Sequence, residues 1–178
     1  FLDFVKEQLR TDKNIKYVHF APPCNTFSQA CWPRVRSVAR PEGKFGVHPK
    51  AKVRVRDANL VVKNMLECCH VADEEGIAVS IENPSKSYLW HMPNMKKYIT
   101  KVDASSYIIH YCRYGEEYKK PTKFVTTLHC LKTLSKTCNH PPKSHAKLSG
   151  WKDLGNKQRK MVPTKGTSPY PWALCSTW

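Results

Sequence analysis

Two short segments of the chain carry side chains that can perform covalent and acid–base chemistry. Cys24 lies in the turn A-P-P-C-N-T-F-S-Q-A, directly after an apolar run over residues 15–20 that predicts a buried strand. Glu82 and Asn83 follow a second apolar run, residues 77–81, which predicts another buried strand. A thiolate is a strong nucleophile, and a carboxyl group holds or transfers a proton. The two segments therefore predict a nucleophile and a carboxyl group at one edge of a sheet.

The turn that carries Cys24 is expected to be stiff. Pro22 and Pro23 fix the backbone φ angle and remove two backbone donors, so the sulfur is held in place. Open α/β sheets bind ligands at the carboxyl ends of their strands, where this turn lies. A buried core cysteine is the alternative interpretation, because free cysteine is among the most buried residue types. The alternative for Glu82 is a surface carboxylate that caps the following helix.

The elements that position these groups follow from the spacing of apolar residues. Helical spacing over residues 53–72 predicts a crossover helix between the two strands. Further helices are predicted at 2–9 and 92–99, and further strands at 107–111 and 123–128. This alternation predicts an α/β fold whose sheet is at least partly parallel.

Two stretches lack apolar periodicity. Residues 32–50 are rich in glycine, proline and arginine and predict a long loop, which at this length is usually functional or disordered. The last fifty residues are dominated by lysine, serine, proline and glycine. We therefore expect an α/β catalytic segment over 1–128 and an irregular basic region over 129–178. The end of that region, with Trp172 and Trp178, is expected to pack back on the sheet.

The chain is strongly basic. It has 30 lysine and arginine residues against 14 acidic residues, a net charge of +16. Residues 34–56 contribute a net charge of +7 and residues 113–165 a net charge of +10. Such clusters predict a polyanionic partner, nucleic acid and above all DNA, because phosphate contacts dominate that kind of binding. A solvated basic surface is the alternative.

Composition also bears on the compartment. No apolar run approaches the roughly 20 residues that span a bilayer, so no membrane partner is expected. The first ten residues form a charged amphipathic segment rather than a signal peptide, although a chain that begins with Phe1 suggests a fragment. The eight cysteines, two of them adjacent, do not suggest a disulfide framework. We expect an intracellular protein with reduced thiols, nuclear if eukaryotic. No sequence feature sets the oligomeric state.

The turn around Cys24 and the Glu82-Asn83 pair resemble a known family. P-P-C-x-x-F-S, followed after a helix and a strand by E-N, is similar to the signature of the cytosine-5 DNA methyltransferases. Two weaker blocks follow in the family's order, similar to its Y-G-x-x-Q-x-R-x-R block and to its closing G-N-S-x-P segment. The residues that match these two blocks are Tyr114, Gly115, Lys119, Lys120, Lys123, Gly166, Thr167, Ser168, Tyr170, Pro171 and Leu174.

The resemblance implies a partial Rossmann-like sheet of the class I methyltransferase type, with crossover helices. It implies methyl transfer from S-adenosylmethionine to cytosine in DNA. Carbon 5 of cytosine is a poor nucleophile until a thiolate has added to carbon 6. By resemblance, Cys24 is that thiolate, Glu82 holds the ring nitrogen and Asn83 braces the loop. A duplex substrate requires that the cytosine be flipped out of the stack.

The resemblance also implies further contacts. The implied substrate-binding residues are Pro23, Ser28, Arg34, Arg36, Lys119, Lys120 and Lys123. The implied cofactor-binding residues are Pro22, Thr167 and Ser168. Lysine lacks the planar fork of arginine, so the lysines in the basic block are not neutral replacements.

The chain departs from the family in ways that affect these expectations. The fourteen residues before Ile15 hold no glycine-rich motif for S-adenosylmethionine, and Pro84 replaces the family's valine after E-N. We therefore expect the cofactor-binding half to be absent and the chain alone not to methylate. A non-catalytic nucleic-acid-binding remnant is the alternative. A third hypothesis, a cysteine hydrolase that pairs Cys24 with His19 or His110, has no accompanying oxyanion-hole pattern.

Two further groups of side chains have a structural and a functional interpretation. Tyr88 and Trp90 are expected to pack against a neighbouring helix, and base stacking is the alternative. No metal site is predicted from standard spacing, because no C-x-x-C motif is present. A mix of thiol and imidazole nevertheless suits zinc, and the alternative is a basic loop with incidental ligands. The weak candidate ligands are Cys130, Cys138, His140 and His145.

Overall fold

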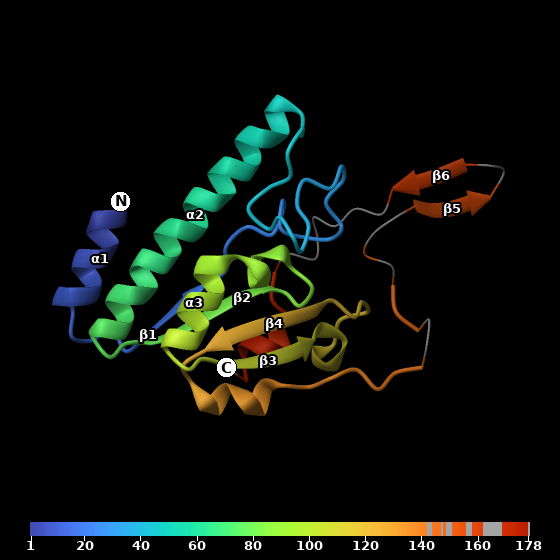
Figure 1. Ribbon diagram of the computed structural model, residues 1–178. Helices are drawn as coiled ribbons and strands as arrows, with labels where there is room; N and C mark the ends of the chain where they lie inside the picture. The colour runs from blue at the N-terminus through green and yellow to red at the C-terminus, as the bar shows by residue number, and fades with distance from the viewer. Residues whose placement is uncertain (142–143, 147, 149–150, 156–157, 162–168, 178) are drawn as a thin grey trace. The chain divides into compact units, whose positions relative to one another are not determined.

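Helices and strands alternate along most of the chain, as the apolar spacing predicts (Figure 1). The computed structural model describes residues 1–141, 144–146, 148, 151–155, 158–161 and 169–177. Its helices and strands are α1 (Leu2–Thr11), β1 (Tyr17–Phe20), α2 (Pro49–Glu74), β2 (Ala78–Pro84), α3 (Pro93–Lys101), β3 (Ser105–His110), β4 (Pro121–Thr126), β5 (Trp151–Gly155), β6 (Gln158–Met161) and α4 (Trp172–Cys175). Short 3-10 helices are η1 (Tyr88–His91), η2 (Tyr111–Tyr114) and η3 (His129–Leu134).

Four strands form one open sheet in the order β1-β2-β4-β3. β1 and β2 run parallel, with Phe20 opposite Ile81. The carbonyl of Val79, at the start of β2, accepts hydrogen bonds from the backbone of Thr127 and the hydroxyl of Thr126 at the end of β4. β4 therefore runs against β2, and the sheet is mixed. The predicted α/β fold with a partly parallel sheet is confirmed.

Two residues at the end of the preceding loop, His48 and Pro49, set the start of the long crossover helix α2. His48 caps it by accepting a hydrogen bond from the backbone N–H of Lys50 at 3.3 Å, and Pro49 occupies the first turn. Proline suits that position because its missing N–H has no partner there in any helix. The helix then runs for 26 residues, longer at both ends than the predicted 53–72.

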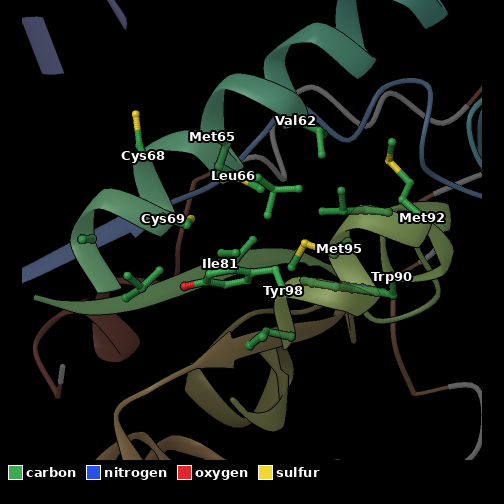
Figure 2. Close-up of a cluster of buried hydrophobic side chains, with 14 of the residues drawn as sticks. Val62, Met65, Leu66, Cys68, Cys69, Ile81, Trp90, Met92, Met95 and Tyr98 are labelled. Atoms are coloured by element: carbon green, nitrogen blue, oxygen red, sulfur yellow. The ribbon is translucent and has the colours of Figure 1, made fainter. Parts of the chain in front are cut away.

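Helices α2 and α3 bury apolar side chains against one face of β2 (Figure 2). The apolar residues of α2 recur three and four positions apart, which gives the helix one continuous buried face. This core includes Val62, Met65, Leu66, Cys69 and Ala72 from α2, Val79 and Ile81 from β2, and Met95 and Tyr98 from α3. Tyr88 and Trp90 belong to the same cluster, so the packing interpretation of these two aromatic residues is confirmed.

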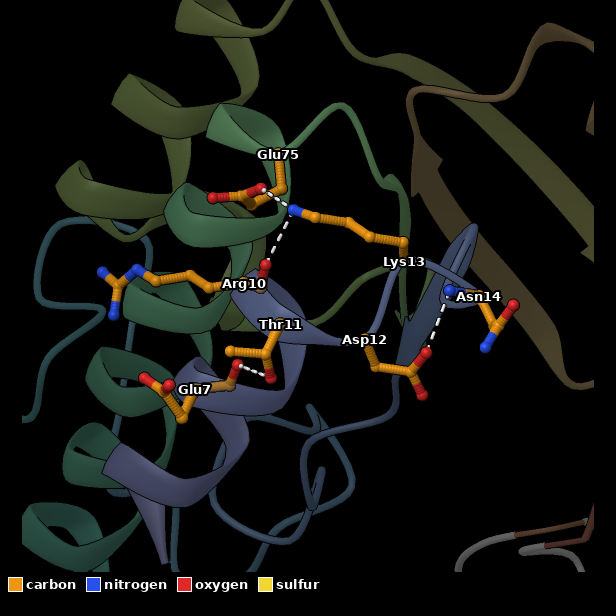
Figure 3. Close-up of polar contacts among 7 residues, drawn as sticks. All are labelled: Glu7, Arg10, Thr11, Asp12, Lys13, Asn14 and Glu75. Carbon is orange, nitrogen blue, oxygen red and sulfur yellow. Dashed lines mark hydrogen bonds and ion pairs between the residues drawn. The ribbon is translucent and has the colours of Figure 1, made fainter.

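Polar contacts join the end of α1 to the end of α2, next to the start of β1 (Figure 3). The ammonium of Lys13 contacts the carboxylate of Glu75 at 3.1 Å and the carbonyl of Arg10 at 2.8 Å. Asp12 accepts a hydrogen bond from the backbone of Asn14 at 2.9 Å. An exposed ion pair of this kind contributes at most about 1 kcal/mol. Burial of Leu9 in the core is therefore the stronger attachment of α1.

Three expectations differ from the structure. All four residues of β1 are half-buried rather than buried, because β1 is an edge strand with a neighbour on one side only. The basic tail holds the antiparallel hairpin β5–β6, in which Trp151 pairs with Met161. The sequence signal for this hairpin is the dipeptide G-N at positions 155–156, which is typical of hairpin connections. Trp172 is 84% exposed, whereas Leu174 of the same segment is buried, and Trp178 lies outside the described residues.

The chain divides into two units. The first comprises Phe1–Ser106 and Lys123–Cys130, and the second comprises Tyr107–Thr122 and Leu131–Trp178. Cys24, Glu82 and Asn83 all belong to the first unit. No helix in the described part of the chain has the length and apolar character needed to cross a membrane.

The packing of α2 over β2 predicts a contrast between two leucines of the same helix. Leu66 is 6% exposed and Leu60 is 54% exposed. We expect Leu66→Ala to lower the free energy of unfolding by about 2–5 kcal/mol, because it leaves a cavity in the core. Leu60→Ala is expected to change it by less than about 0.5 kcal/mol. Urea denaturation followed by circular dichroism measures both, and equal losses would contradict the assigned buried face.

Candidate active site

The turn that carries Cys24 is closed by its own backbone. The carbonyl of Cys24 accepts hydrogen bonds from the N–H groups of Phe27 at 3.0 Å and Ser28 at 2.7 Å. Cys24 is half-buried, in contrast to the core cysteines Cys68 and Cys69. The thiol is thus partly accessible at the carboxyl end of β1, in a turn with little freedom to rearrange.

Asn83 connects the end of β2 to this turn. Its Nδ2 donates a hydrogen bond of 2.8 Å to the carbonyl of Pro22, and the residue is fully buried. Its Oδ1 is also buried and finds no hydrogen-bond partner among the described residues. A buried acceptor without a partner costs about 1–3 kcal/mol, so such atoms are rare in folded proteins. Asn83 therefore makes the contact that a bracing role requires and retains one unused acceptor beside the turn.

Arg36 fixes the turn from the side of the long loop. Its guanidinium lies 3.8 Å from the ring centroid of Phe27 and donates to Thr26 Oγ1 at 2.9 and 3.2 Å. It also donates to Asn59 Oδ1 of α2 at 2.7 Å and to the carbonyl of Pro41 at 2.6 Å. Burial lowers the pKa of Arg36 to about 10.

This placement corrects one expectation. Arg36 is a predicted substrate contact, but it has no exposed surface and its N–H groups donate hydrogen bonds to protein oxygens. The planar fork of arginine allows one side chain to reach several oxygens at once, which explains why arginine occupies this position. Arg36 therefore positions the turn and the loop instead of contacting substrate directly.

Glu82 lies inside the sheet near the end of β2 and is 9% exposed. The helix-cap alternative for Glu82 is wrong, because the residue that caps η1 is Ser87, whose hydroxyl accepts from the N–H of Leu89 at 3.2 Å. Side chains alternate across a strand, so Glu82 shares its face with Ser80. Glu82 is thus a largely desolvated carboxyl at the same end of the sheet as Cys24.

The face of the sheet that carries Ser80 is polar. The hydroxyl of Ser80 lies 2.5 Å from the hydroxyl of Tyr17 and 2.6 Å from Nδ1 of His19. The His19 ring also stacks on Phe124, with 5.9 Å between centroids. Burial lowers the pKa of His19 to about 4, so the ring is neutral at physiological pH. His19 is therefore engaged on β2, the strand that carries Glu82.

Lys123 brings a cation to the same end of β2. Its ammonium lies 5.0 Å from the ring centroid of Trp90, and Trp90 Nε1 donates to the carbonyl of Pro84 at 2.9 Å. Lys123 is half-buried, and burial lowers its pKa. A desolvated ammonium of this kind can favour a negative charge that develops nearby.

The remaining predicted residues are dispersed. Pro23 and Arg34 are exposed, and Ser28 is half-buried and accepts a hydrogen bond from Ala30 N–H at 3.1 Å. Pro22 is buried beneath the turn. Lys119 is exposed. The ammonium of Lys120 lies 4.5 Å from the centroid of the Tyr111 ring. Lys119, Lys120 and Tyr111 belong to the second unit. Thr167 and Ser168 lie outside the described residues.

The loop between β1 and α2 exposes aromatic residues among its arginines. Trp32 is 87% exposed and Phe45 is 80% exposed, and the guanidinium of Arg40 lies 4.0 Å from the Phe45 ring centroid. Among the described ion pairs, none involves a basic residue between positions 34 and 54. Sequence reasoning noted the charge of this loop but missed its aromatic residues, whose signal is an aromatic side chain in an aperiodic basic stretch.

The candidate metal ligands are only partly brought together. Cys138, His140 and His145 lie in one cluster in the second unit, and its fourth member is Cys112 rather than the predicted Cys130. Cys130 is exposed and belongs to the first unit. Cys112 is not recognisable from sequence, because it is separated from the other three ligands by a strand and a 3-10 helix.

The chain was compared with family models, curated proteins and solved structures. Neither a family model, nor a curated protein, nor a solved structure matches this chain. The functional assignment therefore depends on the residues and their arrangement.

The contacts of Arg36 predict that it stabilises the loop through geometry as well as charge. We expect Arg36→Lys, which keeps the charge but removes the fork, to lower the free energy of unfolding by at least about 2 kcal/mol. Arg34→Lys, two residues away on the surface, is expected to change it by less than about 0.5 kcal/mol. Urea denaturation and limited proteolysis of the loop measure the effect. A stable Arg36→Lys variant with an intact loop would contradict the role assigned to Arg36.

Proposed function

We propose that this chain is a cytosine-5 methyltransferase-like catalytic segment, in which Cys24 adds covalently to a cytosine of nucleic acid. The observation that carries the proposal is the junction of two strand ends. β1 and β2 are parallel neighbours, Cys24 and Glu82 lie at the carboxyl ends of these strands, and Asn83 holds the Cys24 turn through Pro22. Ligands of α/β sheets bind at such strand ends.

The strand order supports the finer fold assignment. In the order β1-β2-β4-β3, a strand that runs against β2 is inserted between β2 and the edge strand. A sheet with two parallel neighbours joined by a crossover helix is compatible with the partial Rossmann-like sheet that the resemblance implies. The proposed fold is therefore part of such a sheet.

The residues support a defined chemical step. The thiolate of Cys24 adds to carbon 6 of cytosine. The π electrons of the carbon 5–carbon 6 double bond then form a carbon 4–carbon 5 double bond, and the π electrons of the carbon 4–nitrogen 3 bond move onto nitrogen 3. Glu82, as a carboxylic acid, donates a hydrogen bond or proton to ring nitrogen 3, which leaves an enamine with a nucleophilic carbon 5. Carbon 5 then accepts an electrophile, loses its original proton, and the thiolate leaves. A carboxyl near the base serves this step because it offsets charge that develops in the ring.

The expected methyl donor, S-adenosylmethionine, does not have its site among the described residues. In the family a glycine-rich turn that precedes the Pro-Pro-Cys turn cradles this cofactor, and residues 1–14 hold no glycine. Of the implied cofactor contacts, Pro22 is buried beneath its own turn. The proposal is therefore limited to the addition of Cys24 to cytosine, which needs no methyl donor.

Charge supports nucleic acid as the substrate. The chain carries a net charge of +16, and the loop beside the Cys24 turn exposes arginines together with Trp32 and Phe45. Cations track the phosphate backbone and exposed aromatic rings stack on bases. DNA is the substrate that the resemblance favours.

Addition of Cys24 to cytosine predicts exchange of the hydrogen on carbon 5. In D2O the enamine takes up a deuteron at carbon 5, and reversal of the addition leaves deuterated cytosine. We expect the wild-type chain to deuterate cytosine in an oligonucleotide, as measured by mass spectrometry of its nucleosides. Cys24→Ala is expected to reduce exchange to the uncatalysed rate, and Glu82→Gln to slow it by about 10²–10⁴-fold.

Cys31→Ser is the matched control, because Cys31 is a half-buried thiol seven residues from Cys24. It is expected to exchange at the wild-type rate. Exchange that survives Cys24→Ala, or that is absent from the folded wild-type chain, overturns the nucleophile assignment. Absence of exchange together with tight binding would instead favour the second candidate, a non-catalytic nucleic-acid-binding remnant.

The basic loop predicts salt-dependent binding to nucleic acid. We expect the affinity for a labelled duplex to fall by about 10³-fold or more between about 50 and 200 mM salt. Arg34→Ala and Arg40→Ala are each expected to reduce the slope of log affinity against log salt by about one. Lys13→Ala is the control, since the Lys13 ammonium contacts Glu75. Fluorescence anisotropy measures all four proteins, and a salt-insensitive interaction contradicts binding to phosphates.

A further inference from the structure

Four potential metal ligands converge in the second unit. They are Cys112, Cys138, His140 and His145, and their ligand atoms all lie within 4.8 Å of one another. Cys138 Sγ lies 3.5 Å from His140 Nδ1 and 3.4 Å from His145 Nε2. The two histidine nitrogens are 3.2 Å apart. Three different ligand atoms therefore form a closed triangle, and Cys112 provides the fourth.

The three separations among Cys138, His140 and His145 match those of a tetrahedral zinc site. Zinc binds sulfur at about 2.3 Å and nitrogen at about 2.0–2.1 Å, which at tetrahedral angles separates sulfur from nitrogen by about 3.6 Å and two nitrogens by about 3.4 Å. The three separations around Cys138, His140 and His145 agree with these values. Two thiolates and two neutral imidazoles are a standard ligand set for structural zinc.

Hydrogen bonds alone do not account for the triangle. A protonated ring nitrogen donates but cannot accept, and a deprotonated one only accepts. Each nitrogen or sulfur carries at most one hydrogen, which points along one edge of the triangle. The edges between Cys138, His140 and His145 therefore cannot all be hydrogen bonds at once. A cation at the centre satisfies every lone pair, and two thiolates neutralise the charge of a divalent ion.

The protein holds the ligands in place by contacts that do not involve a metal. The backbone N–H of Cys138 donates to His110 Nδ1 at 2.7 Å, and the N–H of His110 donates to the carbonyl of Lys136 at 3.0 Å. The N–H of Ala146 donates to the carbonyl of Glu117 at 2.9 Å. These bonds align the segment that carries Cys112 with the segment that carries the other three ligands.

We propose that Cys112, Cys138, His140 and His145 bind one structural zinc ion. The second unit consists of two separate stretches of chain, Tyr107–Thr122 and Leu131–Trp178, and the site joins one to the other. Four protein ligands complete the coordination, so the ion has no open position for a substrate and serves to hold the unit together. This proposal is independent of the proposed addition of Cys24 to cytosine.

The test compares two cysteine variants. The full chain, purified without chelator, is expected to contain about one zinc per molecule by plasma mass spectrometry. Cys112→Ser is expected to lose at least about nine-tenths of this metal, since a three-ligand site binds far more weakly. Cys130→Ser, at the exposed cysteine that sequence favours, is expected to retain all of it. Retention by Cys112→Ser, or loss from Cys130→Ser alone, overturns the proposal, as does a folded wild-type chain that binds no zinc.

A second variant covers the case in which Cys112→Ser does not fold. His140→Cys keeps four ligands and changes the set from two sulfurs to three, so it is expected to retain about one zinc. After replacement of zinc by cobalt, its visible absorption is expected to shift toward that of a three-thiolate site, relative to wild type. An unchanged cobalt spectrum, or loss of metal from a folded His140→Cys protein, places the ligands elsewhere and contradicts the proposed site.

Discussion

The hydrogen bond from Asn83 Nδ2 to the carbonyl of Pro22 joins the ends of two parallel strands, and the candidate site depends on it. Without it, the turn after the edge strand β1 would have few attachments to β2. Parallel pairing brings Cys24 and Glu82 to one end of the sheet. The bond then limits the position that the Cys24 turn can take. Among the described residues, the Oδ1 of this fully buried amide has no hydrogen-bond partner, an arrangement that costs free energy.

The buried cation Arg36 is the second feature that fixes the Cys24 turn. Arg36 covers Phe27 and donates to oxygens of the turn, the loop and α2, so the long basic loop has a fixed base although much of its surface is exposed. Burial of a guanidinium is unfavourable unless its donors are used, and here protein oxygens meet them. The outcome is a rigid turn beside an exposed loop that carries Trp32 and Phe45. Such an arrangement fits the proposed function, in which the loop holds a polyanion while the Cys24 turn keeps its position.

Sequence predicted the parts of this structure that depend on local patterns. The helical spacing of α2 and the buried strand β2 could be predicted from sequence, because burial imposes a period on the residues. The core placement of Trp90 was predicted as well. It did not predict which arginine would be buried, since Arg34 and Arg36 differ only in the partners that the fold supplies. The sequence-based prediction grouped Cys130 with the two histidines, whereas the structure places Cys112 there. The packing that brings Cys112 beside Cys138 links residues 26 positions apart and leaves no local pattern.

The proposed function requires that Cys24 be a placed nucleophile for a pyrimidine ring. An oligonucleotide that carries 2-pyrimidinone in place of cytosine tests it directly, because a thiolate adds to carbon 6 of that base and the product is stable enough to isolate. We expect peptide mapping by mass spectrometry to find the adduct on Cys24. We also expect Asn83→Leu, which removes the bond to Pro22, to lower the rate of adduct formation. An adduct on any of the other seven cysteines, or none on the folded chain, would show that Cys24 is not this nucleophile.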